Sequence, residues 1–155
     1  MTMTGETETP GIAGFAGLHH VGYGVPDLDQ AVAFFTQVLG FTVVSRGGPL
    51  RSDTDNRMTR VFGVHPRATA SMVFVRRSDL TVELICWQSL EQRTVPPINS
   101  DIGASHLALA VTDLPATLAF LRTQPGVQVL EPSEGNTFAY VRTPWGMLVQ
   151  FMAVS

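Results

Sequence analysis

Residues 20–35 read HVGYGVPDLDQAVAFF, and residues 106–121 read HLALAVTDLPATLAFL. The two stretches align without a gap at an offset of 86 positions (106 minus 20), which pairs His20 with His106 and Asp27 with Asp113. The same register also pairs Val25 with Val111, Leu28 with Leu114, Ala33 with Ala119 and Phe34 with Phe120. Single identities arise easily by chance, but this many in one ungapped register indicate an internal repeat.

Each repeat predicts a strand followed by a helix. The first strand is expected over 18–25, where β-prone residues alternate in character. Asp27 is a suitable N-cap, with Gln30 three positions on, and apolar residues then recur at helical spacing until Gly40 provides a C-terminal stop. In the second repeat Asp113 caps the helix and Pro115 lies in its first turn, where proline is tolerated.

Three more strands are predicted after each helix, over 41–45, 70–76 and 81–87 in the first repeat and over 127–130, 136–142 and 147–154 in the second. The sequence therefore predicts an α+β fold of two tandem βαβββ modules. A disordered leader is expected over 1–16, the first module over 17–98 and the second over 99–155, all within one compact domain. The first repeat is longer, and we expect the extra residues in a loop at 46–66, with a short helix or irregular segment at 55–64.

Composition excludes several classes of function. The net charge is -3 and no run of Lys or Arg is present, so a nucleic-acid partner is not expected. No stretch approaches about 20 consecutive apolar residues, so no membrane span is expected. The single cysteine, Cys86, rules out an intrachain disulfide and fits a reducing compartment, which predicts a cytoplasmic protein.

Strand alternation sorts polar side chains onto one face of each sheet. His20 shares its face with Gly22 and Gly24, and His106 shares its face with Ala108 and Ala110. By the same alternation Glu83 and Gln150 each stand among apolar neighbours on their strands. A buried carboxylate there would cost several kcal/mol unless it is paired or bound to a cation.

These four positions have two interpretations. Two imidazoles, a carboxylate and an amide oxygen suit one divalent ion such as Zn, Ni, Co, Mn or Fe(II). Alternatively, His20 and His106 are core histidines whose hydrogen bonds are satisfied by the backbone. Repetition of the polar positions at equivalent places favours the metal site, with the ligands His20, Glu83, His106 and Gln150.

From about Phe15 to its C-terminus the chain resembles the vicinal oxygen chelate superfamily, which includes glyoxalase I, bleomycin resistance proteins and extradiol dioxygenases. The segments that carry the resemblance are LHHVGYGV, TVELICW, ASHLALAV and PWGMLVQFM. The resemblance implies a curved open mixed sheet around a metal cleft, with the helices outside. It also implies one inward ligand from the first, fourth, fifth and eighth strands, at His20, Glu83, His106 and Gln150. His19 is expected to face the helix side.

The resemblance implies a lyase, isomerase or epimerase of the glyoxalase I kind, acting through a metal-chelated enediolate of a small oxygenated substrate. Glu83 is the expected catalytic base, because Gln150 stands where many members have a glutamate and an amide cannot accept the proton. Two alternatives remain open: an Fe(II) extradiol-type dioxygenase, and a metal-free drug-binding or resistance protein. A homodimer is expected, because a curved open sheet leaves apolar surface and edges to cover.

Overall fold

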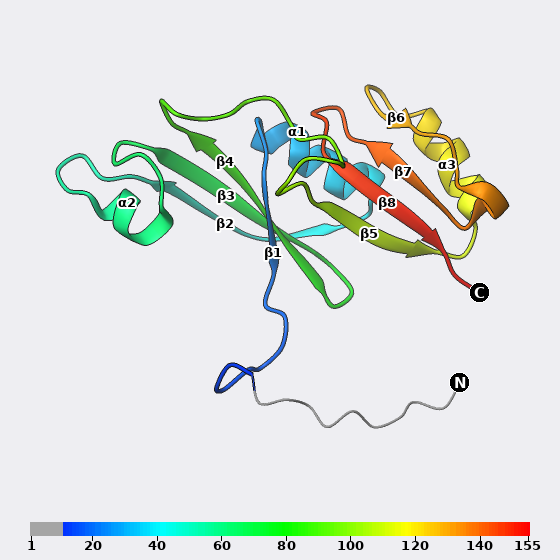
Figure 1. Cartoon of the computed structure of the whole chain (residues 1–155), viewed down its shortest axis with the longest axis horizontal. Helices are drawn as coiled ribbons and strands as arrows, with labels where there is room; N and C mark the ends of the chain where they lie inside the picture. The colour runs from blue at the N-terminus through cyan, green and yellow to red at the C-terminus, as the bar shows by residue number, and fades with distance from the viewer. Residues whose placement is uncertain (1–10) are drawn as a thin grey trace.

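The structure is a computed structural model that describes residues 11–155, and it contains two four-stranded mixed sheets (Figure 1). Residues 1–10 of the expected leader lie outside the described part. The first sheet has the order β1-β4-β3-β2, from Val21–Gly24, Leu80–Gln88, Thr69–Arg77 and Thr42–Leu50. The second has the order β5-β8-β7-β6, from His106–Val111, Leu148–Ala153, Phe138–Arg142 and Gln128–Val129. The predicted α+β fold of tandem modules is confirmed.

The two sheets have the same internal pairing, as a repeat requires. In each, the first strand of the module runs parallel to the last, and the other pairs are antiparallel. Gly22 lies opposite Glu83 across the β1/β4 pair, and Ala108 lies opposite Gln150 across the β5/β8 pair. The offset of 86 positions seen in the sequence therefore relates structurally equivalent positions.

Both predicted helix caps are present. The Asp27 carboxylate accepts the Gln30 backbone N–H at 2.9 Å before α1 (Leu28–Ala33). The Asp113 carboxylate accepts the Ala116 N–H at 2.9 Å before α3 (Leu114–Arg122). Each cap satisfies one of the otherwise unpaired donors of a first helical turn. A 3-10 turn, η2 (Glu134–Asn136), precedes β7.

The first helix differs from the prediction in its second half. It continues from α1 as a π-helix, η1 (Phe34–Val38), in which the Leu39 N–H donates to the Phe34 carbonyl at 3.1 Å. The Thr36 hydroxyl donates to the Val32 carbonyl at 2.8 Å, a side-chain bond that competes with the regular ladder. π-helical turns occur mostly in this way, as single turns that continue an α-helix.

The long loop of the first module is more ordered than its sequence predicts. β2 continues to Leu50, past the expected end at 45, and α2 (Arg57–Phe62) forms within the segment for which a short helix was favoured. The Arg67 guanidinium donates to the Ser52 carbonyl at 2.7 Å and to the Asp55 carbonyl at 3.0 Å. These bonds hold the loop against the start of β3.

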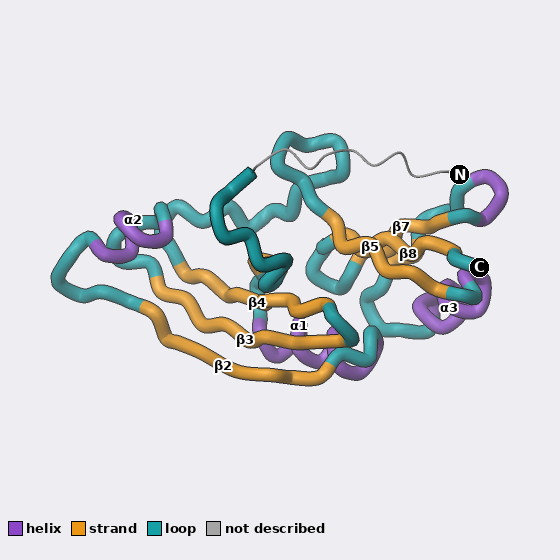
Figure 2. The backbone as a smooth tube through the Cα atoms, turned by 90° about the horizontal axis from the view of Figure 1, so that it is seen from below, coloured by secondary structure: helices purple, strands orange, loops and turns teal. Residues whose placement is uncertain are grey.

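One hydrophobic core joins the two modules on the helix side of the sheets. α1 and α3 lie on the same side of the strands, whereas α2 lies on the other side at the far end of the first sheet (Figure 2). The rings of Phe34 and Trp145 meet edge to face at 5.5 Å between centroids, which links the first helix to the second module. The opposite faces of the sheets, where the polar positions were expected, are left open. Within residues 11–155, no helix is long and apolar enough to cross a membrane.

Candidate functional site

His20 and Glu83 lie together on the open face of the first sheet. The His20 Nε2 atom is 3.5 Å from the Glu83 Oε2 atom, and the two side chains are 33% and 20% exposed. His20 immediately precedes β1, and Glu83 is near the middle of β4. Glu83 pairs with Gly22, two positions after His20, so His20 and Glu83 lie diagonally across the two strands. An imidazole nitrogen and a carboxylate oxygen therefore point into the same partly desolvated space.

Glycine at position 22 makes room for the Glu83 carboxylate. A Cβ atom at Gly22 would lie 3.2 Å from Glu83 Oε2, whereas a Cβ at Gly24 would meet nothing within 4 Å. Both glycines are exposed on the open face, while Tyr23 between them is buried on the helix side. This is the predicted division of β1 into a face without bulk and a packing face.

The second sheet carries an equivalent pair. Ala108 lies opposite Gln150, so His106 and Gln150 have the same diagonal relation as His20 and Glu83. His106 and Ala108 are exposed, and Leu107 between them is buried. Each sheet thus presents one imidazole and one oxygen donor.

The two pairs do not come together within one chain. Among residues 11–155, no three His, Cys, Asp or Glu side chains are grouped closely enough to hold a metal ion. The structure therefore brings His20 to Glu83 but does not bring His106 to them. In one chain the four predicted ligands form two half-sites, one on each sheet.

His19 departs from its predicted place. It is exposed rather than turned toward the helices, because the regular strand starts only at Val21 and alternation does not reach it. Its Nδ1 atom is 2.6 Å from the Nδ1 atom of His20. One of these two nitrogens donates and the other accepts. When the His20 Nδ1 atom is the donor, its Nε2 atom keeps the lone pair that a metal ligand requires.

Two aromatic residues contact the imidazoles, and the sequence predicted neither contact. Phe74 lies opposite Glu83 in β3, and its ring meets the His20 ring edge to face at 5.4 Å. Tyr140 lies opposite Gln150 in β7, and its ring meets the His106 ring edge to face at 5.1 Å. Positions 74 and 140 are not related by the offset of 86, so only the strand register reveals their equivalence.

Cys86 lies on the helix side of β4, packed against the core. Its thiol donates to the Pro26 carbonyl at 3.3 Å. Burial, assisted by the charge of Asp27, raises the pKa of the Cys86 thiol, so the thiolate that a metal would need is disfavoured.

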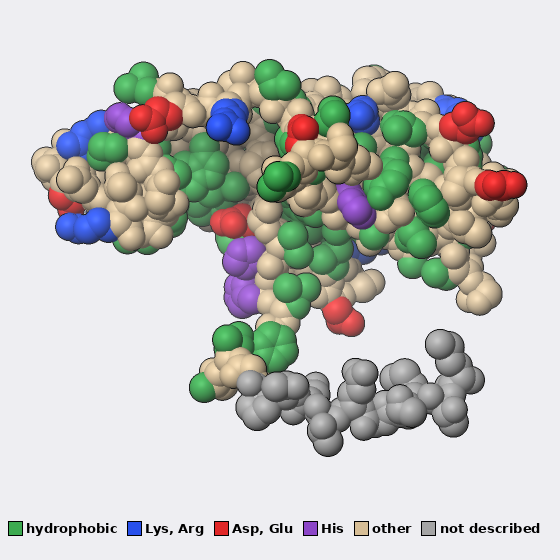
Figure 3. All heavy atoms as spheres, viewed as in Figure 1, with side chains coloured by type: hydrophobic (Ala, Val, Ile, Leu, Met, Phe, Trp, Pro, Cys, Tyr) green, Lys and Arg blue, Asp and Glu red, His purple; other side chains and the backbone are tan. Residues whose placement is uncertain are grey.

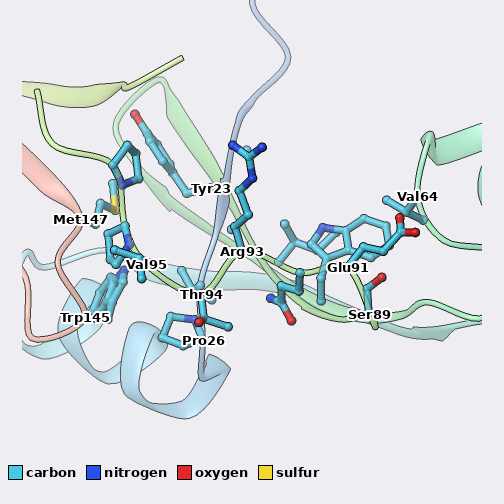
Figure 4. A pocket seen from close by; sticks show the side chains of 18 of the residues that line it. Tyr23, Pro26, Val64, Ser89, Glu91, Arg93, Thr94, Val95, Trp145 and Met147 are labelled. Atoms are coloured by element: carbon cyan, nitrogen blue, oxygen red, sulfur yellow. The ribbon is translucent and has the colours of Figure 1, made fainter. Parts of the chain in front are cut away.

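A cavity of about 820 Å³ opens beside Gly22 (Figure 4). Ile85 and Trp87 of β4 line it from the first module, and Trp145 and Met147 line it from the second. The connecting segment between the modules contributes polar groups, among them Ser89, Glu91 and Arg93. The cavity is large enough for a small organic substrate and combines apolar walls with hydrogen-bonding groups.

Comparison with known proteins identifies the family. Residues 19–140 match the Glyoxalase/Bleomycin resistance protein/Dioxygenase superfamily. A 2-epi-5-epi-valiolone epimerase from Actinomyces sp. is 40% identical over 163 aligned positions, which cover 97% of this chain and 84% of the relative. The chain belongs to this superfamily, and the resemblance noted in the sequence is confirmed.

Solved structures agree on the fold. A glyoxalase family protein from Bacillus cereus has a TM-score of 0.70 at 17% identity, covering 92% of this chain and 98% of that one. The trypanothione-dependent glyoxalase I of Leishmania major has a TM-score of 0.60 at 21% identity, covering 86% and 84%. The fosfomycin resistance protein FosX of Listeria monocytogenes, complexed with Mn(II) and sulfate, has a TM-score of 0.59 at 16% identity, covering 91% and 94%.

Proposed function

We propose that this protein is a metal-dependent epimerase that inverts a carbon next to the ketone of a small polyhydroxylated substrate of the valiolone type. The observation that carries the proposal is the Glu83 carboxylate, which lies 3.5 Å from the His20 Nε2 atom and next to Gly22; Gly22 lines the cavity, although neither Glu83 nor His20 does. The relative that is 40% identical is an epimerase of 2-epi-5-epi-valiolone, which supports both the reaction class and the substrate class.

Epimerisation next to a ketone begins with removal of the proton from the α-carbon. Glu83 is a base of the kind this step needs, and it lies on the open face of the first sheet next to Gly22. Gln150, at the equivalent place in the second sheet, cannot take this role because an amide does not accept a proton at useful pH. A substrate that extends from Glu83 past Gly22 into the cavity would meet its apolar walls, and the polar groups of the connecting segment would be available to its hydroxyls.

The side chains present fit a divalent metal ion. His20 offers its Nε2 atom beside the Glu83 carboxylate, and His106 with Gln150 offers a second imidazole and an amide oxygen. This set of nitrogen and oxygen donors without thiolate suits Zn, Ni, Co, Mn or Fe(II). When bound, the ion would supply a Lewis acid for two adjacent oxygens of the substrate.

We further propose that two copies of the chain form the complete site as a homodimer. The half-sites are separate within one chain, and both lie on open sheet faces. Apolar side chains are also exposed on the segment before β1, which projects from the rest of the molecule (Figure 3). Ile12, Phe15 and Leu18 are each more than 70% exposed. An isologous dimer would bring the first sheet of each copy to the second sheet of the other and would cover such surface.

The direct test of the function is incubation with 2-epi-5-epi-valiolone in deuterium oxide. We expect the metal-loaded protein to form the epimer and to incorporate deuterium at the carbon next to the ketone, as followed by NMR. Chelation of the metal should stop both processes, and adding back a divalent ion should restore them. Absence of both epimer and deuterium with metal-loaded protein, across the stereoisomers of valiolone, would overturn the proposal.

A further inference from the structure

The internal repeat places Tyr140 where the first module has Phe74. Phe74 lies opposite Glu83, and Tyr140 lies opposite Gln150, the position equivalent to Glu83. Both rings contact the neighbouring histidine edge to face, with interplanar angles of 89° and 87°. The two half-sites therefore have the same arrangement of strands and rings. Their chemistry differs at two equivalent positions: Glu83 is replaced by Gln150, and Phe74 by Tyr140.

The difference between the half-sites is complementary. The first sheet combines a carboxylate with a phenyl ring, and the second combines an amide with a phenol. In each half-site, one of these two side chains can exchange a proton. It is Glu83 in the first half-site and Tyr140 in the second. If Tyr140 served only to hold the His106 ring, a phenyl group would be sufficient, as Phe74 is for His20.

We propose that Tyr140 is the second catalytic residue of the epimerase and delivers a proton to the face of the substrate opposite Glu83. This inference rests on the proposed function and on the proposed dimer, in which the first sheet of one copy faces the second sheet of the other. Inversion requires that the proton leave from one face of the carbon and return to the other. A carboxylate on one wall reaches only one face, so the opposite wall must supply the second group.

The proton balance is complete. Glu83 accepts the α-proton, the C–H bond breaks, and its electron pair moves to give the enolate of the ketone. The Tyr140 O–H bond then breaks and a new C–H bond forms on the opposite face, which leaves a phenolate and a carboxylic acid. Proton exchange with water restores both groups, and no oxidant or reductant is consumed.

Tyr140 is also held in a defined position. Its ring is half-buried and packs between the His106 ring and the Phe138 ring, whose centroid is 6.0 Å away. Since Phe138 and Tyr140 are two positions apart on β7, they lie on the same face of the second sheet. A fixed ring keeps its hydroxyl group in one direction, as a proton donor in a single turnover requires.

The test is Tyr140→Phe in deuterium oxide, with inversion and isotope exchange measured in the same sample. We expect inversion to fall roughly 10²-fold or more, the usual contribution of a positioned acid. Deuterium should still enter substrate of unchanged configuration at close to the wild-type rate of exchange, because Glu83 remains. Metal content and thermal unfolding should be unchanged, since the phenyl ring keeps the contact with His106.

Thr123→Val is the control for the loss of one hydroxyl group, because Thr123 is exposed at the end of α3 and lines neither the cavity nor a half-site. It should leave the ratio of inversion to exchange unchanged. Wild-type inversion by Tyr140→Phe, or equal losses of inversion and exchange with the metal retained, would overturn the role of Tyr140 while leaving the epimerase proposal standing. If Tyr140→Phe loses the metal, protein containing 3-fluorotyrosine is the second test: a changed rate of inversion with unchanged exchange supports the role, and an unchanged ratio overturns it.

Discussion

Replacing Glu83 with glutamine is expected to lower turnover by about 10³-fold, the loss expected when a positioned general base is removed. The amide keeps an oxygen donor of similar shape beside His20, whose Nε2 atom is 3.5 Å from the native carboxylate. Metal content should therefore be largely retained. Both inversion and deuterium exchange should be lost together, because the first proton transfer is blocked.

Asp79→Asn is a suitable control for the loss of one negative charge. Asp79 is exposed at the turn between β3 and β4, outside the half-site that contains Glu83. Its replacement should change turnover by less than about two-fold, as is usual for an exposed surface position. Wild-type turnover by Glu83→Gln would show that another group removes the proton.

His20→Ala and His106→Ala should each bind metal at least about ten-fold more weakly than wild type, because each change removes one bond between the protein and the metal. Each variant alone should be nearly inactive. After the two are unfolded, mixed and refolded together, we expect recovery of about one quarter of wild-type activity. Half of the dimers are then mixed, and one of the two sites in a mixed dimer has both halves intact.

This recovery depends on the division of the ligands between two copies. A site formed within one chain would contain a substituted histidine in every subunit of the mixture, so activity would stay at the level of the single variants. Refolded wild-type protein and each variant refolded alone give the reference values. Light scattering that finds only monomer at micromolar concentration would also contradict the proposed dimer.

The sequence alone predicted the repeat, the order of strands and helix along each module and the side of each strand that carries polar groups. These features depend on local periodicity and on the constant offset of 86 positions that relates His20 to His106. The caps at Asp27 and Asp113 were predictable for the same reason, since an N-cap acts on residues three positions away.

Other features depend on contacts that local patterns do not specify. Tyr140 meets His106 only because β7 pairs with β8 and β8 with β5, so the contact follows from two strand registers at once. His19 was misplaced because alternation was extended beyond the start of the strand. The separation of the two half-sites depends on how the sheets are oriented, which the helix-side packing of residues such as Phe34 and Trp145 determines.

The central claim is that His20 and His106 bind the same divalent ion, and X-ray absorption spectroscopy of the zinc-loaded protein with parallel elemental analysis tests it most directly. We expect about one metal per chain, coordinated by two imidazole groups and oxygen donors in wild type and by one imidazole in His106→Ala. Protein that holds no metal after dialysis against Zn, Ni, Co, Mn and Fe(II), or a bound ion whose imidazole count is unchanged in His106→Ala, would contradict the account.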